Sequence, residues 1–217
     1  DPFDLRFTRL LLTTAVSPPG AGAVTPSQGD YAPGDVVTLA ATPADGYVFA
    51  GWEGALTGTE NPVAVTITTD MDLTATFALP TYGLATAANP PGAGSVTPES
   101  GDYVAGDIVT LAATAVIGYQ FTHWDDTPEA VANPLVVTVT GDATRTANFA
   151  RTTHALTATA QPTDGGAVTP DAGLSEYGDV VEFLATPEPG FLFVRWDGSA
   201  AGSANPLSVT VTTDMDI

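Results

Sequence analysis

The sequence repeats itself every 72 residues, and this period constrains the fold more than any other feature. Val24-Thr25-Pro26 recurs as Val96-Thr97-Pro98 and as Val168-Thr169-Pro170. The Gly-Tyr-Val-Phe-Ala-Gly-Trp run that begins at Gly46 and the Asn-Pro pair at Asn61 recur at the same step. A chain of 217 residues therefore predicts three tandem copies of one small module instead of a single large domain.

Within a copy, apolar and polar residues alternate with a period of two. Val37, Leu39 and Ala41 are separated by threonine and alanine. The runs 63–67 and 73–77 alternate in the same way. Such alternation indicates strands with one buried and one solvent-exposed face. Clusters of glycine and proline separate these runs, and no stretch keeps a helical period. We therefore expect an all-β fold with about six short strands in each copy.

The repeat frame also predicts where each module begins and ends. We expect an N-terminal strand over residues 1–9, followed by β modules over 10–79, 80–151 and 152–217, the third without its last strand. Modules of about 70 residues bury little apolar surface. Neighbouring copies joined by short linkers are therefore expected to support one another in an elongated array.

An aromatic run recurs in every copy and predicts the centre of each module. Tyr47 and Phe49 share one strand face, whereas Trp52 falls out of phase, and a bulge at Gly51 would return the indole to the core. A repeated tryptophan could instead offer its ring to a sugar, but large aromatic side chains dominate small cores. The predicted core aromatics are Tyr47, Phe49, Trp52, Tyr119, Phe121, Trp124, Phe191, Phe193 and Trp196.

The stretch from Ala41 to Trp52, Ala-Thr-Pro-Ala-Asp-Gly-Tyr-Val-Phe-Ala-Gly-Trp, resembles the divergent internalin-type B-repeat family. The closing stretch 65–77 resembles it as well, and the resemblance covers nearly the whole chain. It implies a compact β module used in tandem on bacterial cell-surface and secreted proteins, with no activity attached. Related repeats are β-grasp-like, but no convincing helix for that fold is present, so a β-grasp variant and a small Ig-like sandwich both stay open. Arg145, in place of Leu73, departs from the pattern.

The two ends of the chain carry a strand out of place. The third copy stops at Ile217, so it lacks the residues that complete the first-copy strand ending at Phe77. At the other end, Phe3, Leu5 and Phe7 alternate with polar residues in the manner of that strand.

Two explanations fit these ends. The chain is a window cut from a longer array, or the N-terminal strand of one copy completes the third module of the next. Strand donation of this kind is head-to-tail and builds an open filament. An incomplete module leaves an apolar groove and unpaired backbone groups, which favour such a partner. We favour the second explanation, with Phe3, Leu5 and Phe7 as the subunit-linking strand.

The charge balance excludes several classes of partner. The chain has 25 acidic and 5 basic residues and a formal net charge of −20. Such a surface repels the phosphates of nucleic acid and anionic lipid. No apolar run reaches the length of about 20 residues that a membrane helix needs. We therefore expect no nucleic-acid partner and no membrane insertion, and the absence of cysteine excludes disulfides.

Few residues suggest a catalytic or metal-binding site. His123 and His154 have no metal-ligand spacing, and no nucleophile-elbow serine or phosphate-binding glycine motif occurs. We therefore expect no enzyme and no cofactor. Recurrent aspartates are the one candidate for calcium, which prefers oxygen ligands, although aspartate also shapes turns through its own side chain. The calcium candidates are Asp70, Asp72, Asp214 and Asp216.

These features together predict an extracellular or cell-surface structural repeat protein. Its expected partner is a second copy of itself, joined head-to-tail in a filament. The alternative is an adhesin or a carbohydrate-binding stalk segment of a larger secreted protein, with surface glycans or other cells as partners.

Overall fold

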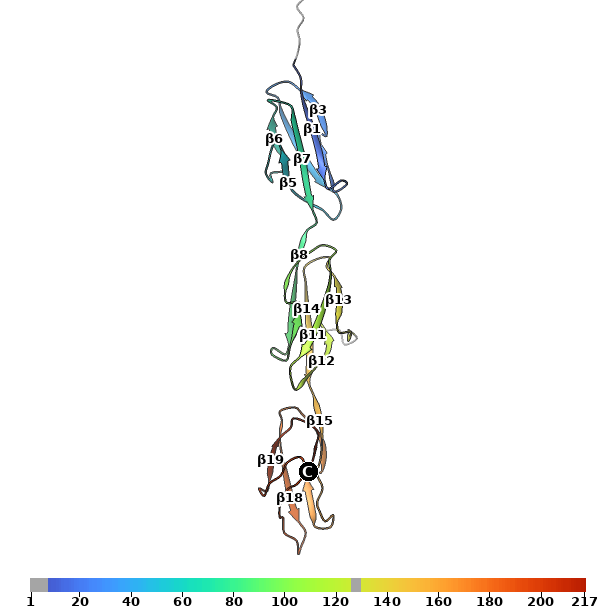
Figure 1. The fold of residues 1–217 in the computed structure, drawn as a ribbon, viewed down its shortest axis with the longest axis vertical. Helices are drawn as coiled ribbons and strands as arrows, with labels where there is room; N and C mark the ends of the chain where they lie inside the picture. Colours follow the sequence, from blue (N-terminus) through green and yellow to red (C-terminus); the bar gives the residue numbers. More distant parts are fainter. Residues whose placement is uncertain (1–7, 126–129) are drawn as a thin grey trace, which may run out of the picture. The chain divides into compact units, whose positions relative to one another are not determined.

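The computed structural model describes residues 8–125 and 130–217, and these residues form strands without any helix (Figure 1). The expected all-β class is thereby confirmed. In the same part of the chain, no helix has the length and hydrophobicity to cross a membrane.

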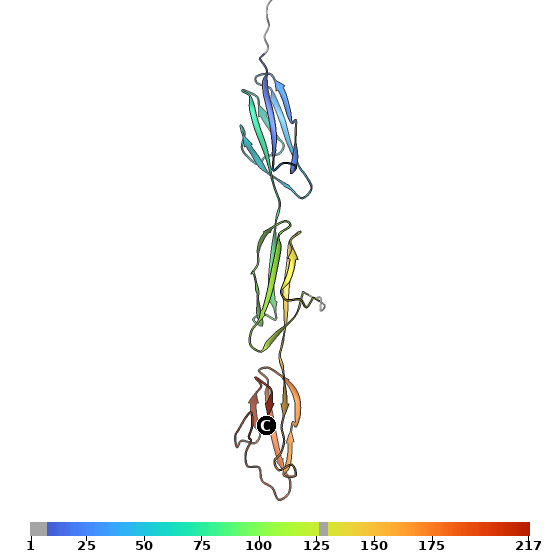
Figure 2. The same cartoon turned by 45° about the vertical axis from the view of Figure 1, so that its right-hand side comes forward.

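The first repeat is built from seven strands in two sheets (Figures 1 and 2). The strands are β1 (Leu10–Ser17), β2 (Gly22–Thr25), β3 (Gln28–Tyr31), β4 (Val36–Pro43), β5 (Val48–Gly54), β6 (Val63–Thr66) and β7 (Met71–Ala78). One sheet has the order β3-β1-β7-β5 and the other has the order β2-β4-β6.

The last strand of the repeat occupies an interior position in the larger sheet. β7 pairs in parallel with β1, from Leu12 opposite Met71 to Ser17 opposite Thr76. On its other side β7 pairs antiparallel with β5. Because β7 is hydrogen-bonded on both edges, β5 reaches the sheet only through it.

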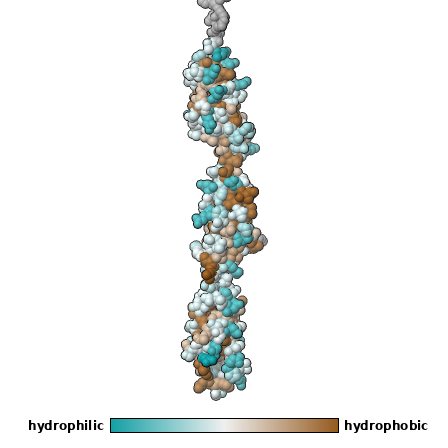
Figure 3. Space-filling view, viewed as in Figure 1, coloured by the Kyte–Doolittle hydropathy of each residue, from teal (hydrophilic) through white to brown (hydrophobic). Residues whose placement is uncertain are grey.

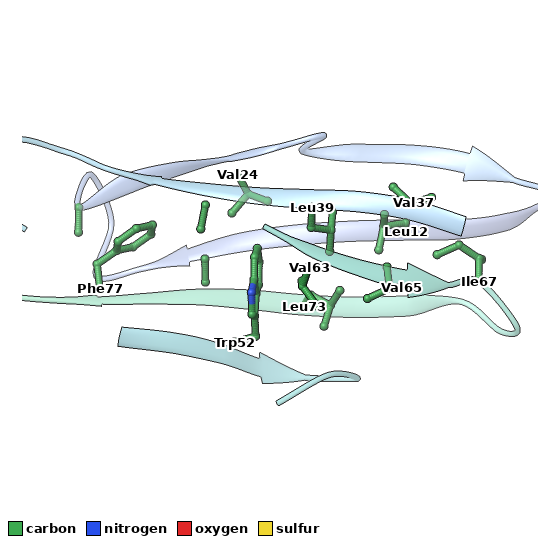
Figure 4. Packing of buried hydrophobic residues seen from close by; sticks show 13 residues of the cluster. Leu12, Val24, Val37, Leu39, Trp52, Val63, Val65, Ile67, Leu73 and Phe77 are labelled. Carbon is green, nitrogen blue, oxygen red and sulfur yellow. The ribbon is translucent and has the colours of Figure 1, made fainter. Parts of the chain in front are cut away.

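The core of the repeat lies between the two sheets, as in a β-sandwich (Figure 4). Every strand except β3 supplies buried apolar residues, as the alternation of the sequence predicts. Of the two topologies that the sequence left open, the structure therefore adopts the sandwich. The buried residues are Leu12, Ala21, Val24, Val37, Leu39, Ala41, Trp52, Val63, Val65, Ile67, Leu73, Ala75 and Phe77.

A bulge in β5 brings Trp52 into this core. The pairing of β5 with β7 shifts register between Phe49 and Gly51, which is where the sequence predicts a bulge. Trp52 is consequently only 2% exposed, and its Nε1–H donates to the carbonyl oxygen of Glu60 at 2.9 Å.

An asparagine side chain extends the smaller sheet where the main chain cannot. The ladder between β4 and β6 ends with Leu39 opposite Val63, and the preceding Pro62 has no N–H to donate. The side chain of Asn61 takes over: its Oδ1 accepts from the Ala41 N–H at 2.9 Å, and its Nδ2 donates to the Ala41 carbonyl at 2.6 Å. The same pair of bonds recurs in the other two repeats, from Asn133 and Asn205.

The second repeat has two sheets of the same kind, in the orders β10-β8-β14-β12 and β13-β11-β9. Its strands are β8 (Thr81–Asn89), β9 (Gly94–Thr97), β10 (Gly101–Val104), β11 (Ile108–Ala115), β12 (Tyr119–Trp124), β13 (Leu135–Thr138) and β14 (Ala143–Arg151).

The third repeat forms two three-stranded sheets, in the orders β17-β15-β20 and β16-β18-β19. Its strands are β15 (Thr153–Thr157), β16 (Gly166–Thr169), β17 (Ala172–Glu176), β18 (Val180–Pro187), β19 (Leu207–Thr210) and β20 (Met215–Asp216). The sheet that contains β15 is therefore one strand smaller than its counterparts in the first two repeats.

Arg151, the last residue of β14, is held by two carboxylates. Its Nη1 lies 2.7 Å from Asp179 Oδ1, and its Nε lies 3.1 Å from Glu176 Oε2. The hydrogen bond from Arg151, followed by one from the Glu176 N–H, lowers the pKa of Asp179 below its usual range. The same hydrogen bond raises the pKa of Arg151.

We expect Asn61→Ala to destabilise the first repeat by about 1–2 kcal/mol, because the Ala41 N–H and the Ala41 carbonyl each lose their hydrogen bond to the Asn61 side chain. The free energy of unfolding and the hydrogen-exchange rate of the Ala41 amide would measure the effect. Glu60→Ala is the matched control, since it keeps the main-chain carbonyl that Trp52 uses. Equal stability of the two variants would contradict the assigned role of Asn61.

We expect Arg151→Gln to raise the pKa of the Asp179 carboxyl toward its ordinary value, since the largest stabilising contact of the carboxylate is removed. A lowered pKa stabilises the folded state above the unfolded-state pKa, and this stabilisation is lost as the pH falls through the folded-state pKa. In the variant, less stability should therefore be lost on acidification. A titration of the Asp179 carboxyl by NMR would measure the shift, and Arg195→Gln should leave it unchanged.

Candidate functional site

The three tryptophans that the sequence places in the module cores are buried. Trp52, Trp124 and Trp196 are each at most 4% exposed. Each indole N–H donates to a main-chain carbonyl eight residues further along the chain, at 2.8–2.9 Å. Their ring faces are consequently turned inward, and none of them offers a platform to a sugar.

The other predicted core aromatics pack less completely. Phe49 and Phe121 are half-buried and lie 5.3 and 5.4 Å from their tryptophans, between ring centroids. Tyr47 and Tyr119 are also half-buried.

In the third repeat one of these aromatics is not in the core at all. Phe191 is 40% exposed, so the prediction that it is a core residue is wrong. Phe193 is half-buried, with its ring centroid 5.2 Å from that of Trp196. The physical reason is that the segment carrying Phe191 has no strand partner in this repeat.

The aspartates proposed for calcium act as hydrogen-bond acceptors for the first strand of their own repeat. Asp70 Oδ1 accepts from the Leu11 N–H at 2.8 Å, and Asp214 Oδ1 accepts from the Ala155 N–H at 3.0 Å. The carboxylates of Asp72 and Asp216 accept from the hydroxyls of threonines on β1 and β15. Within residues 8–125 and 130–217, no three metal-ligating side chains gather in one place.

The predicted linking residues Phe3, Leu5 and Phe7 lie outside the described residues. They were predicted to complete the last strand of the third repeat, and the corresponding strand of the first repeat is described. There the second half of β7 carries Ala75 and Phe77, which are 0% and 5% exposed. Ala75 lies opposite Trp52, and Phe77 lies opposite Phe49 on β5.

The third repeat does not supply these residues. β20 ends at Asp216. The next residue, Ile217, continues the pairing with two hydrogen bonds: the Ile217 N–H donates to the Thr157 carbonyl at 3.0 Å, and the Thr159 N–H donates to the Ile217 carbonyl at 2.9 Å. Residues 191–195, which correspond to 47–51 in the first repeat, form no strand, and an isolated bridge joins Trp196 to Gly202. In the first repeat, the corresponding stretch pairs with β7 beyond Leu73.

An open groove lies beside residues 191–196 of the third repeat. Its volume is about 300 Å³, and it is lined by residues 159–162, 165–168, 185–187 and 191–196. Nearby, Leu192 and Val194 are 88% and 77% exposed. Hydrophobic surface is visible at the end of this repeat that holds the turn after β18 (Figure 3).

One glycine of the groove corresponds to a glycine that contacts an aromatic ring in the first two repeats. In the first repeat, a Cβ atom on Gly22 would lie 2.5 Å from Phe77 Cζ, so the ring rests directly on this glycine. Phe149 rests on Gly94 in the same way. The third repeat keeps the glycine, Gly166, but its nearest neighbours are main-chain atoms of Thr186 and Pro187. The recurrence of this glycine at a 72-residue step was the sequence signal for the ring site.

One charged side chain lines the groove. Arg195 Nε lies 2.9 Å from Asp197 Oδ2, and this hydrogen bond raises the pKa of the guanidinium. The corresponding residues of the first two repeats are Gly51 and His123, so the arginine is particular to the third.

The comparisons with known proteins agree with the repeat frame. The family model of the divergent InlB B-repeat domain matches residues 12–80, 84–153 and 156–217. The predicted resemblance is thereby confirmed. The family is a surface repeat domain that is not known as enzymatic, and three tandem copies of it fit a bacterial surface repeat protein.

Other comparisons add less. A search of curated proteins gives no match. A solved structure, that of the Bacillus anthracis TIE protein, is similar with a TM-score of 0.43 at 8% identity, over 96% of this chain and 49% of that one. The chain thus spans about half the length of that protein's structure, and a likeness of this size does not establish a shared fold. On the family match, which covers nearly all of its residues, the chain belongs to the divergent InlB B-repeat domain family.

Proposed function

We propose that this chain is an extracellular structural protein of a bacterial surface, in which the third repeat accepts the N-terminal strand of a second copy. The observation that carries this proposal is the unpaired stretch 191–195 beside an open groove. Tandem repeats in series set a length, and strand exchange links one copy to the next. The extracellular or cell-surface location is inferred from the family.

The groove offers two sources of binding free energy. Backbone groups along the unpaired stretch can complete a ladder with an added strand, as in other complexes that extend a sheet. An apolar side chain that enters the groove contributes about 1.5–3 kcal/mol by leaving water. In the first two repeats, the corresponding place is filled by the repeat's own last strand.

The partner strand is proposed to come from residues 3–7 of a second copy. Their apolar and polar residues alternate as β7 does in the first repeat. Because donor and acceptor lie on different parts of the chain, the contact is heterologous and adds copies head-to-tail into an open filament. The net charge of −20 opposes lateral association of such filaments.

The adhesin or carbohydrate-binding alternative has less support. The three tryptophans, which could instead have stacked on sugars, are buried and hydrogen-bonded to the main chain. Glycan binding therefore stays a prediction.

We expect the 217-residue chain to run well above 22.0 kDa in size-exclusion chromatography with light scattering, and a chain lacking residues 1–7 to run as a monomer. This truncation keeps Arg9, whose guanidinium donates to the Asp30 carbonyl at 2.9 Å. Assembly should strengthen at higher salt, because salt screens the repulsion between acidic copies.

A chain extended beyond Ile217 by the sequence Thr-Ala-Thr-Phe-Ala of residues 74–78 is the matched control. It fills its own groove and should stay monomeric while keeping its N-terminal strand. If the intact chain and the truncated chain both run at the monomer mass, strand donation between copies is wrong, and the groove takes residues that follow Ile217 in a longer protein.

A further inference from the structure

We propose that a cluster of side chains holds the second and third repeats together as one unit near neutral pH, and that acid opens this contact so that the two repeats move separately. The cluster lies where β14 passes into β15, and we call it the junction cluster. All of its residues belong to the same compact unit of the chain. They are Gly118, Arg151, Thr152, Glu176, Tyr177 and Asp179.

Arg151 supplies the charged part of the junction cluster. Its Nη1 lies 2.7 Å from Asp179 Oδ1 and 3.3 Å from the Tyr177 carbonyl oxygen, and its Nε lies 3.1 Å from Glu176 Oε2. One guanidinium at the end of the second repeat thus binds three oxygen atoms of the third. A single exposed ion pair is weak, but a guanidinium that meets several acceptors also fixes their geometry.

Thr152, the one residue between β14 and β15, adds main-chain hydrogen bonds to both repeats. Its N–H donates to the Gly118 carbonyl at 2.9 Å, and its own carbonyl accepts from the Tyr177 N–H at 2.8 Å. The protection of the Thr152 amide therefore reports whether the linking residue stays bonded to the second repeat.

The ring of Tyr177 covers Gly118. A Cβ atom on this glycine would overlap the ring, so the two residues are in direct contact. Gly118 also has a φ of +87°, a conformation that favours glycine. This contact removes apolar surface from water across the junction and does not depend on charge.

The residue types of the junction cluster do not recur at the 72-residue step. The earlier positions hold a leucine without charge, a proline without an N–H and an alanine without a ring. The chain thus carries the means for these three contacts at one junction. The residues that correspond to Arg151, Thr152 and Tyr177 are Leu79, Pro80 and Ala105.

Asp179 has one use that recurs and one that belongs to the junction. Its Oδ2 accepts from the Glu176 N–H at 3.1 Å, as Asp107 Oδ2 accepts from the Val104 N–H at 2.9 Å. The bond from Arg151 to Asp179 Oδ1 comes in addition to this turn contact. Holding a turn therefore does not account for the arginine.

The carboxylate of Asp179 makes the junction sensitive to acid. The hydrogen bond from Arg151 is the largest cause of its lowered pKa. A lowered pKa gives stability that is present above the unfolded-state pKa and is lost as the pH falls through the folded-state pKa. Protonation at that step removes the charge that attracts Arg151, and the contact between the repeats weakens.

The other titratable groups around the junction cluster act differently or at higher pH. Glu176 shares Arg151 with Asp179, so its protonation weakens the same contact. Tyr119 lies opposite Arg151 on β12, and the His154 ring centroid lies 6.3 Å from that of Tyr177, with its Nδ1 3.3 Å from Asp214 Oδ1. Histidine ordinarily changes charge between about pH 5 and 8 and tyrosine near about pH 10, above the step of a carboxyl whose pKa is lowered.

Hydrogen exchange of the full chain, followed by NMR at neutral pH, tests the contact. We expect Arg151→Leu and Tyr177→Ala each to lower the protection factor of the Thr152 amide by about three- to tenfold. Arg195→Leu is the matched control, since it removes an arginine that pairs with Asp197 inside the third repeat, and it should leave Thr152 unchanged. Amides in the ladder between β18 and β19 should stay protected in all three variants, which shows that the third repeat is folded.

Residual dipolar couplings give a second readout, of the motion itself. Couplings from the second and third repeats should fit one alignment tensor at neutral pH, and should need two once Asp179 is protonated. The double variant with Arg151→Leu and Tyr177→Ala should need two tensors at neutral pH, where acid unfolding does not interfere.

Two results would overturn the proposal. If the two repeats of the unaltered chain need separate tensors at neutral pH, or if Arg151→Leu and Tyr177→Ala leave the Thr152 amide as protected as before, the junction cluster does not hold the repeats together. If the Thr152 amide keeps its full protection factor after the Asp179 carboxyl has titrated, acid does not open the contact.

Discussion

The pairing of the last strand inside the larger sheet is the interaction on which each repeat depends. In the first repeat, β7 joins β1 in parallel on one edge and β5 on the other. It also carries Leu73, Ala75 and Phe77 into the core. A strand in that position connects the start of the module to its tryptophan-bearing strand, so its loss removes backbone partners and core volume at once.

The third repeat keeps the same division into two sheets. Its sheet of β16, β18 and β19 pairs as its counterparts do, and Phe183, Val211 and Trp196 are buried. Residues 191–195 form no strand, and Phe191 is 40% exposed. The two sheets are held by separate sets of hydrogen bonds, so the order of one does not depend on the pairing at the edge of the other.

Two kinds of side chain, asparagine and aspartate, supply hydrogen bonds to the main chain in every repeat. The Asn61 amide replaces a peptide group where proline interrupts the smaller sheet, and its counterparts do so in the other repeats. Asp70 and its counterparts accept an N–H from the first strand of their repeat. These aspartates therefore have a structural use as hydrogen-bond acceptors, which weakens the case that they are calcium ligands.

The sequence by itself determined the period, the strand class and the bulge at Gly51, because each depends on the local order of apolar and polar residues. Only the tertiary structure revealed the use of Asn61, since the Ala41 peptide group that it binds lies 20 residues away in sequence. The contact between the Phe77 ring and Gly22 also needed the fold. The two residues come from opposite ends of the module, and pairing between distant segments leaves no periodic signal in either one.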